Sequence, residues 1–138
     1  MTTKNIWSAI DFTDNPGQSA YDLLLPQKDK LRASTGGELV MEVEAIDAYS
    51  NTEPPRPAAL YVVFVVAPKL NNFRRKILTV LEHRMEGYFP VTVFNHVESI
   101  KDQEVSETDF LDVISKVLSR PKVQSVVQGL YRHSKSIG

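Results

Sequence analysis

Cysteine is absent from this chain, so disulfides, a thiolate nucleophile and cysteine-ligated metal centres are all excluded. The chain also lacks a glycine-rich loop of the Gly-x-Gly-x-x-Gly or Gly-Lys-Ser type, and therefore carries no phosphate-binding signature. It has no Gly-x-Ser-x-Gly turn, the motif with which many hydrolases present a serine nucleophile. These absences remove several enzyme classes before any secondary structure is assigned.

An excess of charge of one sign is missing too, because 16 basic and 17 acidic residues give a formal net charge of -1. We therefore expect no nucleic-acid partner and no attraction to an anionic membrane. The N-terminus has no apolar signal core, and no apolar run approaches the roughly 20 residues of a membrane span. The expected location is the cytoplasm, which the lack of cysteine also fits.

The sequence contains few residue patterns that are typical of a metal site or of acid–base catalysis. His83, His96 and His133 are scattered without a His-x-x-x-His spacing, so we expect neither a metal nor another cofactor. Glu42 and Glu44 are predicted to share one strand face, but the strand has no lysine that would complete a nuclease-like site. These observations favour a protein that is not an enzyme, although they leave catalysis open.

The apolar content is sufficient for one packed core. The chain has 138 residues, of which 42% are hydrophobic, and this is typical of a single globular domain. Residues 1–18 are expected to form an irregular arm, and residues 131–138 a flexible polar tail. The one tryptophan, Trp7, lies in the arm, where it either anchors the arm to the domain or contacts a partner.

A short apolar run organises the first half of the chain. Residues 60–67 are all apolar or aromatic and precede a proline, which predicts a central strand buried on both faces. Helical spacing predicts a helix over residues 19–34, with Pro26 either at a kink or as the first helical residue. Alternation over residues 39–46 predicts a half-buried strand, joined to the central strand as an antiparallel hairpin.

The second half is predicted to alternate between helix and strand. Apolar positions at helical spacing predict a helix over residues 70–86. Residues 89–94 predict a third strand, which a right-handed crossover would place parallel to the central one. Residues 95–104 are expected to be a polar connection.

Two further helices are predicted near the C-terminus. Ser106 is expected to cap the first of them, and Pro121 to begin the second. The predicted fold class is therefore α/β (α+β), with a small mixed sheet of three to four strands and the helices packed on it. The expected order is helix, strand, strand, helix, strand, helix, helix.

One basic cluster is the candidate ligand-binding site. It lies where the predicted central strand ends and the following predicted helix begins. A helix N-terminus favours an anion, and arginine adds bidentate hydrogen bonds to phosphate or carboxylate. The alternative is that these residues are solvated charges and helix caps. The residues of the cluster are Lys69, Asn71, Asn72, Arg74 and Arg75.

Charge is unevenly distributed along the chain. Residues 38–53 contain acidic residues and no basic one, whereas residues 69–76 contain four basic residues and no acidic one. Opposite patches on neighbouring molecules would steer association. We therefore expect a non-enzymatic binding or interaction domain, with a protein partner or self-association as a homodimer. The alternative is an enzyme or sensor that binds a small anion at the basic cluster.

Overall fold

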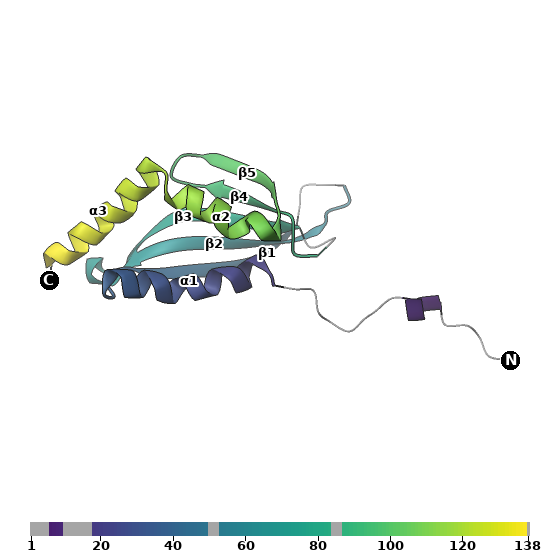
Figure 1. Cartoon of the computed structure of the whole chain (residues 1–138), viewed down its shortest axis with the longest axis horizontal. Coiled ribbons are helices and arrows are strands. Elements are labelled where there is room, and N and C mark those ends of the chain that lie inside the picture. Colours follow the sequence, from purple (N-terminus) through teal and green to yellow (C-terminus); the bar gives the residue numbers. More distant parts are fainter. Residues whose placement is uncertain (1–5, 10–17, 50–52, 84–86, 138) are drawn as a thin grey trace.

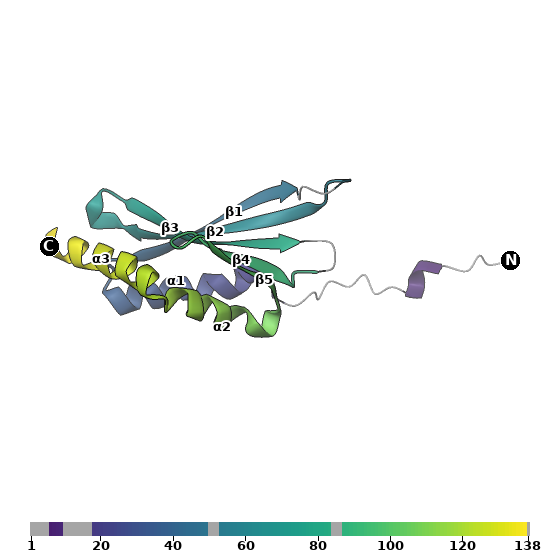
Figure 2. The ribbon, with the colours of Figure 1, turned by 90° about the horizontal axis from the view of Figure 1, so that it is seen from above.

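The computed structural model describes residues 6–9, 18–49, 53–83 and 87–137. In chain order the elements are η1 (Ile6–Ala9), α1 (Ala20–Thr35), β1 (Val40–Tyr49), β2 (Pro57–Ala67), η2 (Pro68–Leu70), β3 (Phe73–His83), β4 (Val91–Asn95), β5 (Ile100–Val105), α2 (Glu107–Leu118) and α3 (Pro121–Ile137). The strands form one five-stranded antiparallel sheet of order β1-β2-β3-β4-β5. Helices α1, α2 and α3 lie on the same face of this sheet (Figures 1 and 2). The α+β class is confirmed, whereas the predicted strand count and element order are wrong.

Helix α1 begins at a capping box, as its sequence allows. The hydroxyl of Ser19 accepts a hydrogen bond from the backbone N–H of Asp22, and the carboxylate of Asp22 accepts one from the backbone N–H of Ser19. The helix ends at Gly36, whose φ of 61° is the left-handed conformation that glycine adopts without strain. Pro26 lies inside α1, so it is not the first helical residue.

Strand β2 contains the predicted buried run and pairs with β1 as the expected antiparallel hairpin. It is the second of five strands rather than the middle one. Successive side chains of a strand point to opposite faces. One set packs into the core beneath the helices, and the other faces the side of the sheet that no described helix covers, which we call the open face. The core set is Ala59, Tyr61, Val63, Val65 and Ala67, and the buried side chains of the open face are Val62, Phe64 and Val66.

The predicted helix over residues 70–86 is wrong, because residues 73–83 form strand β3. A β-bulge explains the error. Lys76 pairs with Phe64 and Leu78 with Val63, so Ile77 is an extra residue in the ladder. Ile77 and Leu78 are both buried in the core beside each other, which breaks the alternation of a regular strand and imitates helical spacing.

The predicted right-handed crossover, which would place residues 89–94 parallel to β2, is wrong as well. Strand β4 pairs with β3 in antiparallel register and does not reach β2. Residues 100–105, expected to be part of a polar connection, form edge strand β5. Its side chains are exposed except for Val105, so the segment carries almost no hydrophobic signal.

Both C-terminal helices form where the sequence predicts them. The hydroxyl of Ser106 accepts a hydrogen bond from the backbone N–H of Asp109 and caps α2. Helix α3 begins at Pro121 and continues to Ile137, so most of the predicted polar tail is helical. In the predicted N-terminal arm, the structure describes η1 and the residue that precedes the cap of α1, and the rest of the arm lies outside the described residues.

Candidate functional site

The basic cluster lies on a hairpin rather than at the start of a helix. The short η2 turn leads through Asn71 and Asn72 into β3, and both asparagines have positive φ values, 59° and 56°. Asparagine tolerates this left-handed conformation better than most residues. The helix dipole on which the predicted anion site depended is therefore absent.

Acidic side chains of the same chain pair with two members of the cluster. Lys69 Nζ lies 2.7 Å from Glu38 Oε1. Arg74 Nη1 lies 3.7 Å from Glu42 Oε2 and 3.5 Å from Glu44 Oε2. Some of the opposite charges that the sequence predicts to attract neighbouring molecules are therefore paired within one molecule, between β1 or the residues before it and η2 or β3.

Arg74 and Arg75 point to opposite faces of the sheet. Arg74 is in register with Val66 of the open face, and Arg75 with Val65 of the core face. The five candidate residues therefore do not converge on one ligand, and anion binding by them stays a prediction.

Charged side chains cover the centre of the open face. Phe64 is flanked in the register by Glu42 on β1 and Lys76 on β3, while the guanidinium carbon of Arg74 lies 4.0 Å from its ring centroid. Phe64 is consequently only 7% exposed although no described helix packs on it. Contacts within the chain therefore cover Phe64, whereas Ile46 toward the other end of β1 is 40% exposed.

Two further polar pairs lie on the sheet, away from the basic cluster. Thr79 Oγ1 lies 2.6 Å from Nε2 of His96, and the Tyr61 hydroxyl donates to the buried carboxylate of Glu82 at 3.2 Å. Burial, followed by the positive charge of Lys76, lowers the pKa of His96. Within the described ranges, no group of three histidine or acidic side chains is placed to hold a metal ion.

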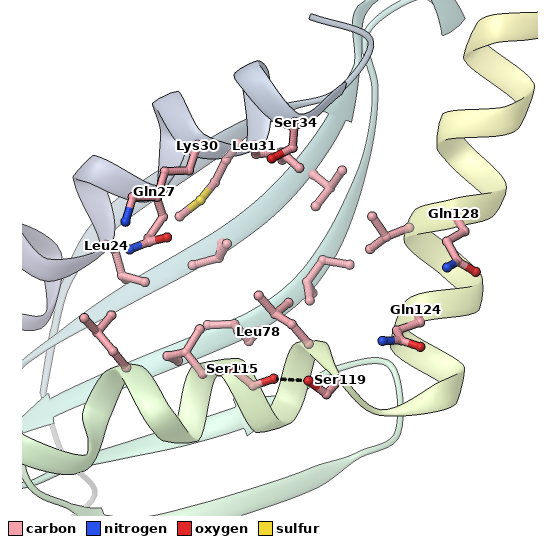
Figure 3. A pocket seen from close by; sticks show the side chains of 18 residues that line it. Leu24, Gln27, Lys30, Leu31, Ser34, Leu78, Ser115, Ser119, Gln124 and Gln128 are labelled. Carbon is pink, nitrogen blue, oxygen red and sulfur yellow. Dashed lines mark hydrogen bonds between the residues drawn. The ribbon is translucent and has the colours of Figure 1, made fainter. Parts of the chain in front are cut away.

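A concave site lies between the three helices. We call it the helix-side pocket, a hollow of about 490 Å³ whose floor is the core face of the sheet and whose walls are α1, α2 and α3 (Figure 3). Its apolar lining is Leu24, Leu31, Met41, Val63, Val65, Ile77, Leu78, Leu111, Ile114, Leu118 and Val127. Its polar lining is Gln27, Lys30, Ser34, Ser115, Ser119, Gln124 and Gln128.

The pocket exists because the helices leave part of the sheet uncovered. Helix α1 packs along β1, and α2 packs against β5 at the other side of the sheet. The side chains of β2 and β3 between them therefore form a floor that neither helix covers completely, and α3 closes one end (Figure 3).

Helix α2 turns two leucines toward this pocket. Leu111 and Leu118 are 42% and 44% exposed, and they are seven residues apart, so they lie on the same side of the helix. The apolar pattern of this helix predicts that Leu111 and Leu118 are buried together with Phe110, Ile114 and Val117, and for the two leucines this prediction is wrong. The core buries Phe110, Ile114 and Val117. An apolar stripe wider than one packed face was the signal that the sequence offered for the pocket.

Polar contacts fix α3 near both of its ends. Just before the helix, Arg120 donates from Nε and Nη2 to the two carboxylate oxygens of Glu98, at 2.6 and 3.1 Å. Near its end, the buried Ser134 hydroxyl donates to Glu38 Oε2 at 2.5 Å. These contacts hold the third wall of the pocket in place.

Both carboxylates have shifted pKa values. Hydrogen bonds from Lys69 and then Ser134 lower the pKa of Glu38. A hydrogen bond from Arg120 lowers the pKa of Glu98, and the same bond raises the pKa of Arg120. Each shift means that the ion-paired form is favoured in the folded protein.

The fold and site together define an α+β domain with an antiparallel meander sheet, three helices on one face and an apolar pocket between them. A scan against protein-family models matches no family, and searches of curated proteins and of solved structures find no match either. None of the helices in the described part of the chain is long and apolar enough to cross a membrane.

Proposed function

We propose that this protein is a non-enzymatic interaction domain that binds an apolar side chain of a protein partner in the helix-side pocket. The observation that supports this proposal is the size and lining of the hollow. Protein interiors are close-packed, so an aliphatic hollow of about 490 Å³ is far larger than an ordinary packing defect. Its volume lies within the range of about 300–1,000 Å³ that is usual for ligand pockets.

The chemistry of the lining supports binding rather than catalysis. Lys30 is the one ionisable side chain among the described residues that line the pocket. A general acid–base reaction needs a positioned group with a suitable pKa, and a nucleophile needs a neighbouring base. Neutral amides and hydroxyls at the rim instead offer hydrogen bonds to a peptide backbone, as the polar rim of an interface does.

Leu111 and Leu118 supply the driving force that the proposal requires. Each is a little over 40% exposed in the free protein, so a bound side chain would remove further apolar surface from water. Fully burying a leucine side chain contributes about 1.5–3 kcal/mol, so covering the remaining surface of the two leucines contributes on the order of 1–3 kcal/mol. An aromatic or aliphatic anchor that fills the pocket adds its own burial to this amount.

A photo-crosslinking experiment tests the proposal in the full chain. A photoreactive amino acid replaces Ser115 at the pocket, so that illumination crosslinks a bound partner protein. The amount of crosslinked partner is then compared with the amount in each of two variants, L118D and I137D. L118D is expected to abolish the crosslink, because it places a charge in the apolar site. I137D is the matched control, since Ile137 is 54% exposed and lies outside the lining, and it should leave the crosslink unchanged.

The proposal is wrong if the same protein is crosslinked equally well in the L118D background while circular dichroism shows an intact fold. It is also wrong if specific crosslinks form only from a position on the open face, such as Lys101. Stabilisation by phosphorylated or carboxylated compounds that is lost in R75A would favour the anion-binding alternative instead.

A further inference from the structure

We infer that Trp7 docks into the helix-side pocket of its own chain and so competes with the partner for that site. The inference rests on the proposed function of the pocket, and it adds that the side chain of Trp7 occupies the pocket when no partner is bound. Trp7 is the single tryptophan of the chain and is 61% exposed in η1. A tryptophan this exposed leaves a large apolar surface in water, and such side chains are frequent anchors of interfaces.

The sequence around Trp7 resembles an anchor segment in its composition. Residues 6–12 read Ile-Trp-Ser-Ala-Ile-Asp-Phe, so the large apolar side chains of the N-terminal arm are concentrated within seven positions. The remainder of residues 1–18 is mainly polar, glycine or proline.

The tether is long enough for docking within one chain. Residues 10–17 join η1 to the segment before α1, and an extended chain spans at most about 3.3–3.6 Å per residue, which gives roughly 25–30 Å. Helix α1 has 16 residues and is therefore about 24 Å long. The pocket wall on α1 begins at Leu24, about one turn from the helix start. The tether is thus long enough for Trp7 to reach the pocket wall on α1.

The charges of the arm and the rim are complementary. Lys30 is the charged residue of the rim, and Asp11 and Asp14 follow Trp7 in the tether. Gln27 of α1 lies on one side of the hollow and Gln124 and Gln128 of α3 on another, and all three offer amide oxygens to the indole N–H (Figure 3). A short tether gives an effective concentration in the millimolar range, so even a weak contact is populated.

Because the chain has one tryptophan, its fluorescence reports this docking directly. In the full chain, the emission of Trp7 should lie at shorter wavelength than that of N-acetyltryptophanamide and be protected from acrylamide quenching. L118D should shift the emission to longer wavelength and remove the protection, whereas I137D should change neither. The emission should not depend on protein concentration, because the contact is within one chain.

Emission like that of the free indole, or emission that L118D leaves unchanged, overturns the inference. Emission that returns to the free value on dilution also overturns it, since the pocket would then take the arm of a neighbouring molecule. Circular dichroism of each variant verifies that the fold is retained.

Binding of an anilinonaphthalenesulfonate dye separates failure of this inference from failure of the proposed function. Full-length W7A should bind several-fold more dye than the wild type, because the competing side chain is gone. Equal binding by both proteins overturns the role of Trp7 but leaves the pocket as a binding site. If neither protein binds the dye, or if L118D does not reduce the binding, the pocket is not an apolar binding site and both proposals fail.

Discussion

The guanidinium carbon of Arg74 lies 4.0 Å from the ring centroid of Phe64, on the face of the sheet opposite the helices. The same guanidinium reaches the carboxylates of Glu42 and Glu44 on β1. One side chain therefore covers an aromatic ring on β2 and neutralises two acids beyond it. Contacts within the chain thus cover the centre of the open face, while the helix face contains the pocket.

Replacing Arg74 by alanine should lower the free energy of unfolding by about 1 kcal/mol. An exposed cation–π contact contributes about 0.5–1 kcal/mol, and exposed ion pairs add about 0.2–1 kcal/mol. R74K should lose less, because an ammonium retains the charge but not the planar contact. Urea unfolding measures both. R75A is the matched control, since Arg75 lies on the other side of the strand, and an equal loss in R75A would contradict the assigned role of Arg74.

The parts of the fold that sequence predicts well have local causes. The cap of α2 at Ser106 and the start of α3 at Pro121 both depend on residues within one turn of the helix end. The hairpin of β1 and β2 follows from two segments with strong strand patterns.

The parts that sequence misses depend on distant partners. The sequence of β3 predicts a helix because the bulge at Ile77 depends on pairing with β2, which that segment alone does not reveal. The sequence predicts that Lys69 and Arg74 bind an anion or remain solvated, because their partners Glu38 and Glu44 lie about 30 positions away. The pocket depends on the spacing of three helices, so no single segment could predict it.

Stability should fall in mild acid partly because of Glu38. Hydrogen bonds from Lys69 and Ser134 hold the pKa of Glu38 below the ordinary value of 4.5 in the folded protein. A lowered folded-state pKa means that the unfolded chain takes up the proton first. The contribution is therefore complete above about pH 4.5 and is lost as the pH falls through the folded-state pKa.

The substitution E38Q should flatten this acid dependence and also lower stability near neutral pH. K69M removes the larger cause of the shift and should flatten the dependence in the same way, and the double variant should add little beyond either single one. Urea midpoints measured across the acid range provide the comparison. An unaltered pH dependence in E38Q would show that other carboxylates account for the acid sensitivity.

His96 should titrate below its ordinary pKa of 6.5, and K76M should raise that pKa. Burial is the larger cause of the lowered pKa and remains in the variant, so the rise should be partial. The stability that this histidine contributes is present above pH 6.5 and declines as the pH falls toward the folded-state pKa. Nuclear magnetic resonance of the imidazole protons measures the titration, and a pKa that K76M leaves unchanged would remove Lys76 as a cause.

Ser134 should decide how firmly the end of α3 is held against the sheet. Its hydroxyl is fully buried and donates a hydrogen bond to Glu38. Glu38 also forms a salt bridge with Lys69, which lies in the turn after β2. S134A removes one of the two hydrogen bonds that lower the pKa of Glu38, so that pKa should rise toward its ordinary value. Amide hydrogen exchange in the last turns of α3 should become several-fold faster, because local opening no longer breaks this bond.

S136A is the matched control for this prediction, because Ser136 is exposed and its hydroxyl donates to the backbone carbonyl of His133 within the same helix. It should leave the pKa of Glu38 unchanged. If S134A and S136A affect exchange in the last turns of α3 equally, the contact with Glu38 does not hold α3. The pocket wall would then depend on the pair of Arg120 and Glu98 at the start of the helix, and R120M would be the variant that releases it.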